Sequence, residues 1–487
     1  MTIPQDRTVP PGGRSHTRIL IALIVIEVFA VFETAMAIAA IPNFMKVFEA
    51  DAAAAGWTTT AYLLVGASSA ATAGRLGDIF GRRNVLVVIL AGAACGSLVS
   101  VLANDLWMIT VGRGVQGLAA GALPLSFGLV RELLPERRVP LAVALLGGIV
   151  PICTGAGALL AGVLIDHSGW RLLFIVATAM GAAASLTALI GLPRTPGIRP
   201  RPPVDIVGAV LLVPATGGVL FGVSRAEEWG WSDARVLAAI AVGLVALALW
   251  VWWELRVREP IVDVRQFTDR KVALTTLATV LVGAGPMGAA ALLTPMVLQL
   301  PDASPIGQGL SATTAGVVMV IASTIGYGGA AVSGRIAELA GARWALVVAG
   351  VLYIAGAGMW IFMAKSLPGT ILCTGLLAVG SAFAYSALAN LIVEVVPSEQ
   401  TAAATGMNRV TLNVAVATGL SITAVILTVS TVPGTHLPTE KALTGACLFM
   451  VACSAVSLVL ALLIGGTRRA PVQQAPTPGL GTEQAAA

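Results

Sequence analysis

Glu27, Glu33 and Arg113 are ionisable residues that lie inside long apolar stretches of the sequence. A charged side chain near the centre of a lipid bilayer costs on the order of 2.5–3.5 kcal/mol or more unless it is paired or hydrated. Burial disfavours the charged form of an acid and a nearby cation restores it, so acids in such places are suited to binding and releasing protons. These residues therefore indicate proton exchange inside a membrane protein.

The positions of Glu33 and Arg113 predict that the two side chains lie at the same depth. Glu33 stands about eight residues before the outer end of a predicted span, 19–41, and Arg113 about seven residues after the outer start of another, 106–130. At about 1.5 Å per residue, both are roughly 10–12 Å from the outer edge. We expect them to pair, directly or through water, facing a central cavity, with Gln116 as a neutral hydrogen-bonding partner one turn further on. The alternative is a structural ion pair.

Glu27 lies about 9 Å further toward the cytoplasm and roughly 120° around the same helix. It is a candidate to exchange a proton for a cationic substrate, and the alternative is a pairing with a packing neighbour. Arg409 is close to the inner end of its span, where a long side chain can reach the interface, and the sequence gives it no role.

No motif for ATP hydrolysis or for enzyme chemistry is present. The only Lys-Ser pair, Lys365-Ser366, lacks the preceding glycines of a phosphate-binding loop. No constellation of nucleophile, metal ligands or cofactor-binding residues is found, so an enzyme is not expected. The energy source is then a proton gradient or the gradient of the substrate itself, and no cofactor is expected.

The composition requires a membrane protein. Hydrophobic residues make up 57% of the chain and charged residues 11%, with a mean hydropathy of +0.90. Apolar runs of roughly 20 residues recur, each long enough to cross about 30 Å of bilayer as a helix. The predicted fold class is an all-α polytopic membrane protein with fourteen spans: 19–41, 55–73, 85–103, 106–130, 140–165, 172–192, 206–224, 236–255, 272–300, 312–332, 344–363, 370–393, 406–429 and 442–464.

The chain is internally duplicated. The stretch GRLGDIFGRR at 74–83 is repeated loosely as GRIAELAGAR at 334–343, and ELLP at 132–135 is echoed by EVVP at 394–397. Two parallel repeats of this kind suit alternating access to a central site. The predicted parts are an N-terminal tail (1–18), a six-helix bundle (19–192), a linker with two extra helices (193–271, with spans 206–224 and 236–255), a second six-helix bundle (272–464) and a disordered tail (465–487).

The distribution of charge predicts the orientation. Most of the 29 Lys and Arg residues fall in segments that share one side of the membrane. The positive-inside rule places these segments and both termini in the cytoplasm. A multi-pass protein of the cell (inner) membrane follows. The excess of arginine over lysine together with abundant alanine favours a bacterium with a GC-rich genome of the actinobacterial kind.

Five segments in order resemble the major facilitator superfamily, in particular its fourteen-helix drug/proton antiporter branch. They are the stretch 74–83, the Arg-x-x-Gln-Gly-like segment 113–117, the helix-1 segment 33–42, the outer loop 229–232 and the linker 259–262. The resemblance implies two six-helix bundles plus two inserted helices. It implies proton-coupled export of drugs or antibiotics, amphipathic or cationic. The expected partners are a small-molecule substrate, protons and the lipid bilayer, with no nucleic acid and no obligatory protein partner.

The chain departs from that family pattern in two helices. The helix-1 segment has Glu33, Ala35 and Ile38 where the branch carries Asp, Thr and Asn. The helix-5 motif lacks its proline and one glycine. We still expect four small or kinking residues to keep this helix bendable: Pro151, Gly155, Gly157 and Gly162.

The stretch 74–83 predicts a cytoplasmic gate. Gly74 and Gly81 allow a tight turn, and Asp78 is expected to latch the gate through nearby arginines, Arg82 and Arg131. Other functions remain open from the sequence: a dedicated exporter of one endogenous metabolite or self-made antibiotic, a proton-coupled uptake permease, or a non-transporting membrane sensor.

Overall fold

The computed structural model describes residues 13–50, 52–197, 205–258, 260, 264–301, 304–363, 366–396, 400–428, 430–431 and 438–464. Residues 1–12 of the predicted N-terminal tail and the whole predicted tail 465–487 lie outside the described residues. So do Glu259, Lys365, Pro397 and the side chains at 34–39 and 41–42, which belong to segments quoted above.

The protein is built from long helices. Among the described residues, eleven stretches are long and apolar enough to cross a membrane. They correspond to α3 (Arg82–Val101), α6 (Val139–Ser168), α7 (Trp170–Gly191), α8 (Ile206–Trp229), α9 (Ala234–Glu254), α10 with η4 and α11 (Arg270–Val282, Gly283–Met287, Gly288–Gln299), α12 (Ala312–Ala340), α13 (Ala342–Met363), α14 (Leu367–Val395), α15 (Thr401–Thr428) and α16 (Glu440–Leu463).

Three further helical rods pack against these stretches. They are α1 (Gly13–Val47), α2 (Ala52–Phe80) and the continuous rod α4–η1–α5 (Leu106–Gln116, Gly117–Gly121, Ala122–Leu133). The short 3₁₀ turns η2 (Glu136–Arg138) and η3 (Val264–Thr268) lie in connections. Two rods change helix type in their middle: η1 is a 3₁₀ turn rich in glycine, and η4 is a π-helical turn around Pro286, whose missing N–H disturbs regular helix bonding.

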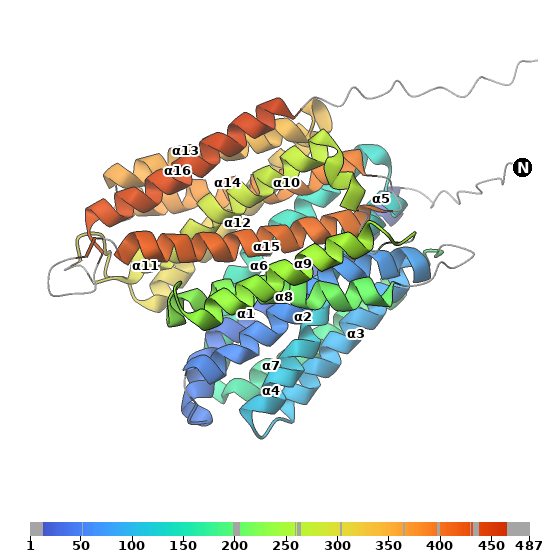
Figure 1. The fold of residues 1–487 in the computed structure, drawn as a ribbon, viewed down its shortest axis with the longest axis horizontal. Helices are drawn as coiled ribbons and strands as arrows, with labels where there is room; N and C mark the ends of the chain where they lie inside the picture. Colours follow the sequence, from blue (N-terminus) through green and yellow to red (C-terminus); the bar gives the residue numbers. More distant parts are fainter. Residues whose placement is uncertain are drawn as a thin grey trace, which may run out of the picture.

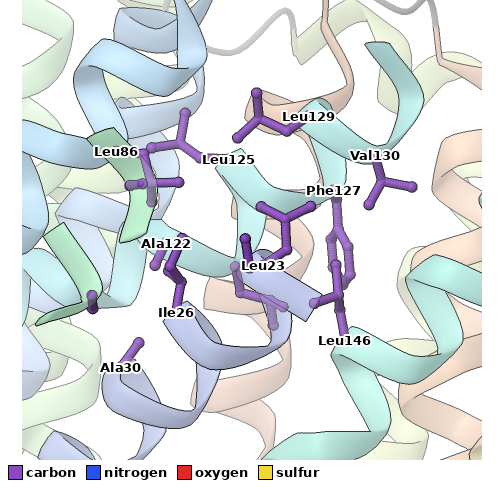
Figure 2. Close-up of a cluster of buried hydrophobic side chains, with 14 of the residues drawn as sticks. Leu23, Ile26, Ala30, Leu86, Ala122, Leu125, Phe127, Leu129, Val130 and Leu146 are labelled. Atoms are coloured by element: carbon purple, nitrogen blue, oxygen red, sulfur yellow. The ribbon is translucent and has the colours of Figure 1, made fainter. Parts of the chain in front are cut away.

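The buried apolar side chains gather mainly in one core for each half of the chain, although the first core also includes Ala389 and Val393 of α14. In the first half, Figure 2 shows Leu23, Ile26 and Ala30 of α1 facing side chains of α3, α5 and α6, among them Leu86, Leu125 and Leu146. In the second half, a separate core joins α10 to α14 and α16. The sequence repeat therefore corresponds to two helical bundles.

The inserted helices α8 and α9 pack on each other, and α8 also contacts α2 of the first bundle and α15 of the second. Figure 1 shows this pair in green between the blue and the red parts of the chain. Ser421 of α15 donates a hydrogen bond to the carbonyl oxygen of Val223 at 3.3 Å. These two helices therefore bridge the bundles at one side of their interface.

The two bundles approach each other most closely near the two repeated stretches. A Cβ atom added at Gly74 of α2 or at Gly406 of α15 would collide with the main chain of the other helix. On the α6–α12 pair, a Cβ atom at Gly334 would lie 2.7 Å from Ala144, whereas one at Gly155, further along α6, would lie 3.5 Å from Val320. A Cβ atom at Gly148 of α6 would lie 2.2 Å from Ala330, so the α6–α12 contact is tight along the half of α6 nearer the predicted cytoplasmic end.

Candidate functional site

Glu33 lies at the end of a chain of buried hydrogen bonds. Ser97 of α3 donates from Oγ to Glu33 Oε1 at 2.6 Å, and Gln116 Nε2 of α4 donates to Ser97 Oγ at 2.6 Å. Arg113 Nη1 in turn donates to Gln116 Oε1 at 2.5 Å. All four side chains belong to residues with no exposed surface. We call Glu33, Ser97, Arg113 and Gln116 the Glu33 network.

Small residues bring the elements of this network together. The Asp105 side chain accepts a hydrogen bond from Met108 N at 2.7 Å, which caps the start of α4. A Cβ atom at Gly96 would lie 2.6 Å from the carbonyl oxygen of Gly112, so α3 and α4 can touch along their backbones only because these positions are glycines. This close approach puts Ser97 within reach of Gln116.

The predicted direct pairing of Glu33 with Arg113 needs correction. Arg113 Nη1 donates to the main-chain carbonyl oxygen of Glu33 at 3.0 Å, and no ion pair between the two side chains is found in the described part of the chain. The guanidinium lies instead over the Tyr62 ring, with 4.5 Å between Cζ and the ring centre. The Glu33 carboxyl and the Arg113 guanidinium are connected by the hydrogen bonds of Ser97 and Gln116.

The Glu33 network is not fully satisfied. Glu33 Oε2 and the Nε and Nη2 atoms of Arg113 are buried and have no hydrogen-bond partner among the described residues. An unpaired buried polar group costs roughly 1–3 kcal/mol, and more if it is charged. Binding a proton, admitting water or changing conformation would each lower this cost, so the network is able to respond to all three.

Ser97 and Tyr62 are members of this site that the sequence reasoning missed. Ser97 lies about six residues from the end of its predicted span 85–103, or roughly 9 Å, which is close to the depth of Glu33. A comparison of depths across all spans would have selected it. Tyr62 gives no comparable signal, because its contact with Arg113 depends on how α2 is rotated.

Glu27 forms a second buried acid, separate from the Glu33 network. Glu27 is 1% exposed, and the Ser126 hydroxyl of α5 donates a hydrogen bond to Glu27 Oε1 at 2.9 Å. Arg409 of α15 and Cys153 of α6 lie within electrostatic range of Glu27. Glu27 therefore faces the boundary between the two bundles.

A narrow cavity lies at this boundary. The first bundle contributes α5 and α6 and the second contributes α14 and α15, with the lining residues Leu123, Pro124, Phe127, Gly147, Tyr385, Leu388, Ala389, Thr405, Asn408, Arg409 and Leu412. Arg409, which the sequence left without a role, lies over the Tyr385 ring with 5.1 Å between Cζ and the ring centre. Position along α15 alone does not reveal that its side chain turns toward the other bundle.

The predicted gate residue Asp78 is paired with Arg82 rather than with Arg131. Arg82 Nη2 and Nε lie 2.9 and 3.1 Å from Asp78 Oδ1, and Arg82 Nη1 donates to the carbonyl oxygen of Gly128 at 2.9 Å and to Glu132 at 3.4 Å. Burial raises the pKa of the Asp78 carboxyl to about 6, although Arg82 acts in the opposite direction. Asp78 lies in the last turn of α2 and Arg82 opens α3, so the turn at Gly81 brings the two side chains together.

Arg131 instead joins the two bundles. Its Nη1 donates to the carbonyl oxygen of Val396 and, at 2.7 Å, to Thr401 Oγ1. Arg137 of the first bundle and Glu338 of the second also form an ion pair at 2.9 Å. Arg131 thus lies where a cytoplasmic gate would close.

The turn before α3 requires glycine. Gly81 has a φ of +89°, and a Cβ atom there would collide with the carbonyl oxygen of Thr195. This turn holds Asp78 and Arg82 beside α5, where Arg82 reaches Gly128.

The helix-5 residues lie in α6, which is helical from Val139 to Ser168. Gly155 faces Val320 and Ser323 of α12, and Gly157 is buried. The surroundings of Pro151 and Gly162 lie outside what the structure describes. Bending of α6 at these four residues stays a prediction.

Comparisons with known proteins agree with this architecture. The family model described as Major Facilitator Superfamily matches residues 23–420. The tetracenomycin C resistance and export protein of Streptomyces glaucescens is 31% identical over 283 residues, which is 58% of this chain and 52% of that protein. A multidrug resistance protein B homolog of Mycobacterium tuberculosis is 32% identical over 268 residues, or 53% of this chain and 48% of that protein. These matches span about half the length of the curated relatives.

A solved structure extends the likeness to the whole fold. The human organic anion transporter MFSD10 (TETRAN) superposes with a TM-score of 0.64 over 94% of this chain and 100% of that one. Its sequence identity to this chain is 16%, so the likeness concerns the fold alone.

Proposed function

Because the chain belongs to the Major Facilitator Superfamily, we propose that it is a proton-coupled exporter of amphipathic drugs or antibiotics. The observation that carries the proton coupling is the Glu33 network, in which a fully buried carboxyl group is linked by hydrogen bonds to helices α3 and α4. Relatives named for resistance and export support the substrate class.

We propose a topology of fourteen transmembrane helices with both termini in the cytoplasm. The eleven apolar stretches and the three rods α1, α2 and α4–η1–α5 together supply this number. The excess of positive charge on one side supports the orientation. With this orientation, the tight contacts of α2 with α15 lie at the cytoplasmic end and close it.

A contiguous path links the Glu33 network to the gate. In α4–η1–α5, Gly117 packs directly on the main chain of α2, where its Cβ atom would lie 2.6 Å from the carbonyl oxygen of Tyr62. The same helix α2 reaches α15 at Gly74. A proton on Glu33 turns one carboxylate oxygen into a donor, which changes the hydrogen bonds to Ser97 and Gln116. The resulting shift of α4 against α2 biases the contact between the bundles.

A susceptibility panel in an efflux-deficient bacterial host tests the proposed function. Expression of the chain is expected to raise the inhibitory concentration of at least one amphipathic drug or antibiotic several-fold, and an uncoupler is expected to abolish the protection because it removes the proton gradient. Vector-only cells and a truncated chain are the controls. Protection that survives the uncoupler contradicts proton coupling, and no protection against any compound favours uptake or a sensor.

The breadth of the panel distinguishes a general exporter from a dedicated one. Protection against several unrelated compounds supports drug export. Protection against a single compound supports the dedicated exporter of one metabolite or antibiotic.

A further inference from the structure

Asn390 is a buried polar residue of α14 that belongs neither to the Glu33 network nor to the lining of the cavity between the bundles. It is 2% exposed and lies about five residues, or roughly 8 Å, before the predicted cytoplasmic end of α14 at Val395. Its neighbours Ala389 and Val393 pack into the apolar core of the first bundle. This end of α14 is therefore part of the contact between the bundles.

The side-chain amide of Asn390 makes a hydrogen bond from one bundle to the other. Asn390 Nδ2 donates to the carbonyl oxygen of Ser386, one turn earlier in α14, at 3.0 Å. It also donates to the carbonyl oxygen of Pro140, in the first turn of α6, at 3.2 Å. A side-chain amide has two N–H donors, so these two bonds satisfy both of them. The bond to Pro140 exists only while α14 and α6 are in contact.

This bond lies on a different part of the bundle contact from the bonds of Arg131. Arg131 binds Thr401 at the start of α15, whereas Asn390 binds the start of α6. Further along α6, a Cβ atom at Gly147 would lie 3.5 Å from the carbonyl oxygen of Tyr385 in α14, so the two helices stay close over this stretch. Asn390 thus fastens the α6–α14 side of the cytoplasmic contact.

An amide suits a contact that has to form and separate repeatedly. A buried N–H group needs an acceptor, which favours the one register of α14 on α6 that places Pro140 within reach. When the two helices separate at their cytoplasmic ends, water replaces the Pro140 carbonyl as the acceptor. The amide is therefore satisfied in both conformations, and the contact is specific without being permanent.

We propose that Asn390 is a positioning residue of alternating access, whose amide holds α14 on the start of α6 while the cytoplasmic end is closed and releases it when that end opens. The inference rests on the proposed function, because it needs a transporter that alternates between two conformations. It does not depend on the identity of the substrate or on proton coupling.

Asn390→Asp gives a test in which the donor can be switched by pH. The new side chain has the shape of the old one, but it can donate to Pro140 only when it is protonated, and an ionised carboxylate is better solvated in the open conformation. We expect the ratio of closed to open protein to fall at least tenfold between about pH 5 and about pH 9, relative to the wild type over the same range. Asn390→Ala lacks the donor at every pH, so its ratio is expected to be about two- to tenfold below that of the wild type at both pH values.

Distances between spin labels at Glu136 and Leu339, which are exposed residues of the two bundles, measure this ratio in full-length protein in lipid nanodiscs. Ser386→Ala is the matched control. It removes the buried hydrogen bond of 2.9 Å from Ser333 within the second bundle but keeps the main-chain oxygen that Asn390 binds. Its distances are expected to match those of the wild type at both pH values.

Two results would overturn the inference. One is a set of distances in Asn390→Asp and Asn390→Ala that matches the wild type at both pH values. The other is a change in Asn390→Asp that is the same at both pH values, because a packing defect, unlike a lost donor, is not repaired by protonation. Return of the sample from about pH 9 to about pH 5 checks that the change is reversible.

The label distances require neither substrate nor a proton gradient, so failure of the two proposals can be told apart. If the susceptibility panel shows no uncoupler-sensitive export while the distances change as expected, the role of Asn390 stands and the exporter proposal falls. If export is uncoupler-sensitive while the distances in both variants match the wild type, the exporter stands and the role of Asn390 falls.

Discussion

Replacing Glu33 by glutamine is expected to abolish uphill transport while leaving downhill exchange of substrate within a few-fold of the wild type. Glutamine keeps the shape of the side chain and an oxygen that can accept the hydrogen bond from Ser97, but it cannot bind or release a proton. Moving one proton through 100 mV supplies about 2.3 kcal/mol, which maintains a substrate concentration ratio of roughly 50-fold. Without that proton the ratio is expected to fall to one.

The measurement compares two assays in proteoliposomes: accumulation driven by an imposed proton gradient, and counterflow of labelled substrate without a gradient. Glu136→Gln is the matched control, since Glu136 is an exposed acid in the short turn η2. Retention of gradient-driven accumulation by Glu33→Gln would contradict the role of the carboxyl. Loss of both assays would point to a structural defect, which the elution profile of the purified protein distinguishes.

Replacing Gly406 by leucine is expected to hold the cytoplasmic end of the protein open. Any Cβ atom at this position collides with the main chain of α2 at Ala70, so the α2–α15 contact cannot form as it does here. Overpacking of a close contact costs typically 1–3 kcal/mol, which lowers the population of the closed cytoplasmic end about tenfold or more. Transport is expected to fall by a similar factor, because alternating access needs both conformations.

Spin labels at Glu136 and Leu339, which are exposed residues near the predicted cytoplasmic ends of the two bundles, report this change. The distance between them is expected to lengthen in Gly406→Leu. Gly358→Leu is the control, because a Cβ atom at Gly358 of α13 meets nothing within 4 Å. An unchanged label distance together with wild-type transport would show that the α2–α15 contact is not a gate.

The family and the helical fold could be predicted from the sequence because their signals are local. Apolar runs of span length, the repeat of 74–83 at 334–343 and the segment 113–117 depend on the order of residues alone. The match of the family model over residues 23–420 confirms the superfamily. The fourteen-helix branch and the cytoplasmic placement of the termini stay proposals.

The candidate site could be predicted only in part. The sequence gives the depth of a residue along its helix, but it does not give the rotation of that helix about its axis. Counting residues placed Glu33 and Arg113 at one depth, and the structure does bring them into one network. Counting could not show that the guanidinium would bind a main-chain carbonyl and the Tyr62 ring instead of the carboxyl. Those contacts depend on the rotation of α2 and α4 about their axes.

The same limit explains Arg409 and Asp78. The distance of Arg409 from the end of its helix suggested an interfacial side chain, but the rotation of α15 turns it toward α5 and α14. For Asp78, the turn at Gly81 and the packing of α3 on α5 place Arg82 beside it, whereas Arg131 reaches across to the other bundle. In both cases tertiary packing decided the partner.

Proton movement during transport tests the central claim most directly. Proteoliposomes that contain the wild-type protein and a pH-sensitive dye in the lumen receive, on the outside, a substrate that the susceptibility panel has identified. Antiport predicts that the lumen becomes more alkaline as substrate enters, and that Glu33→Gln removes the change in pH. An unchanged internal pH during substrate entry, or acidification of the lumen, would contradict proton antiport by this protein.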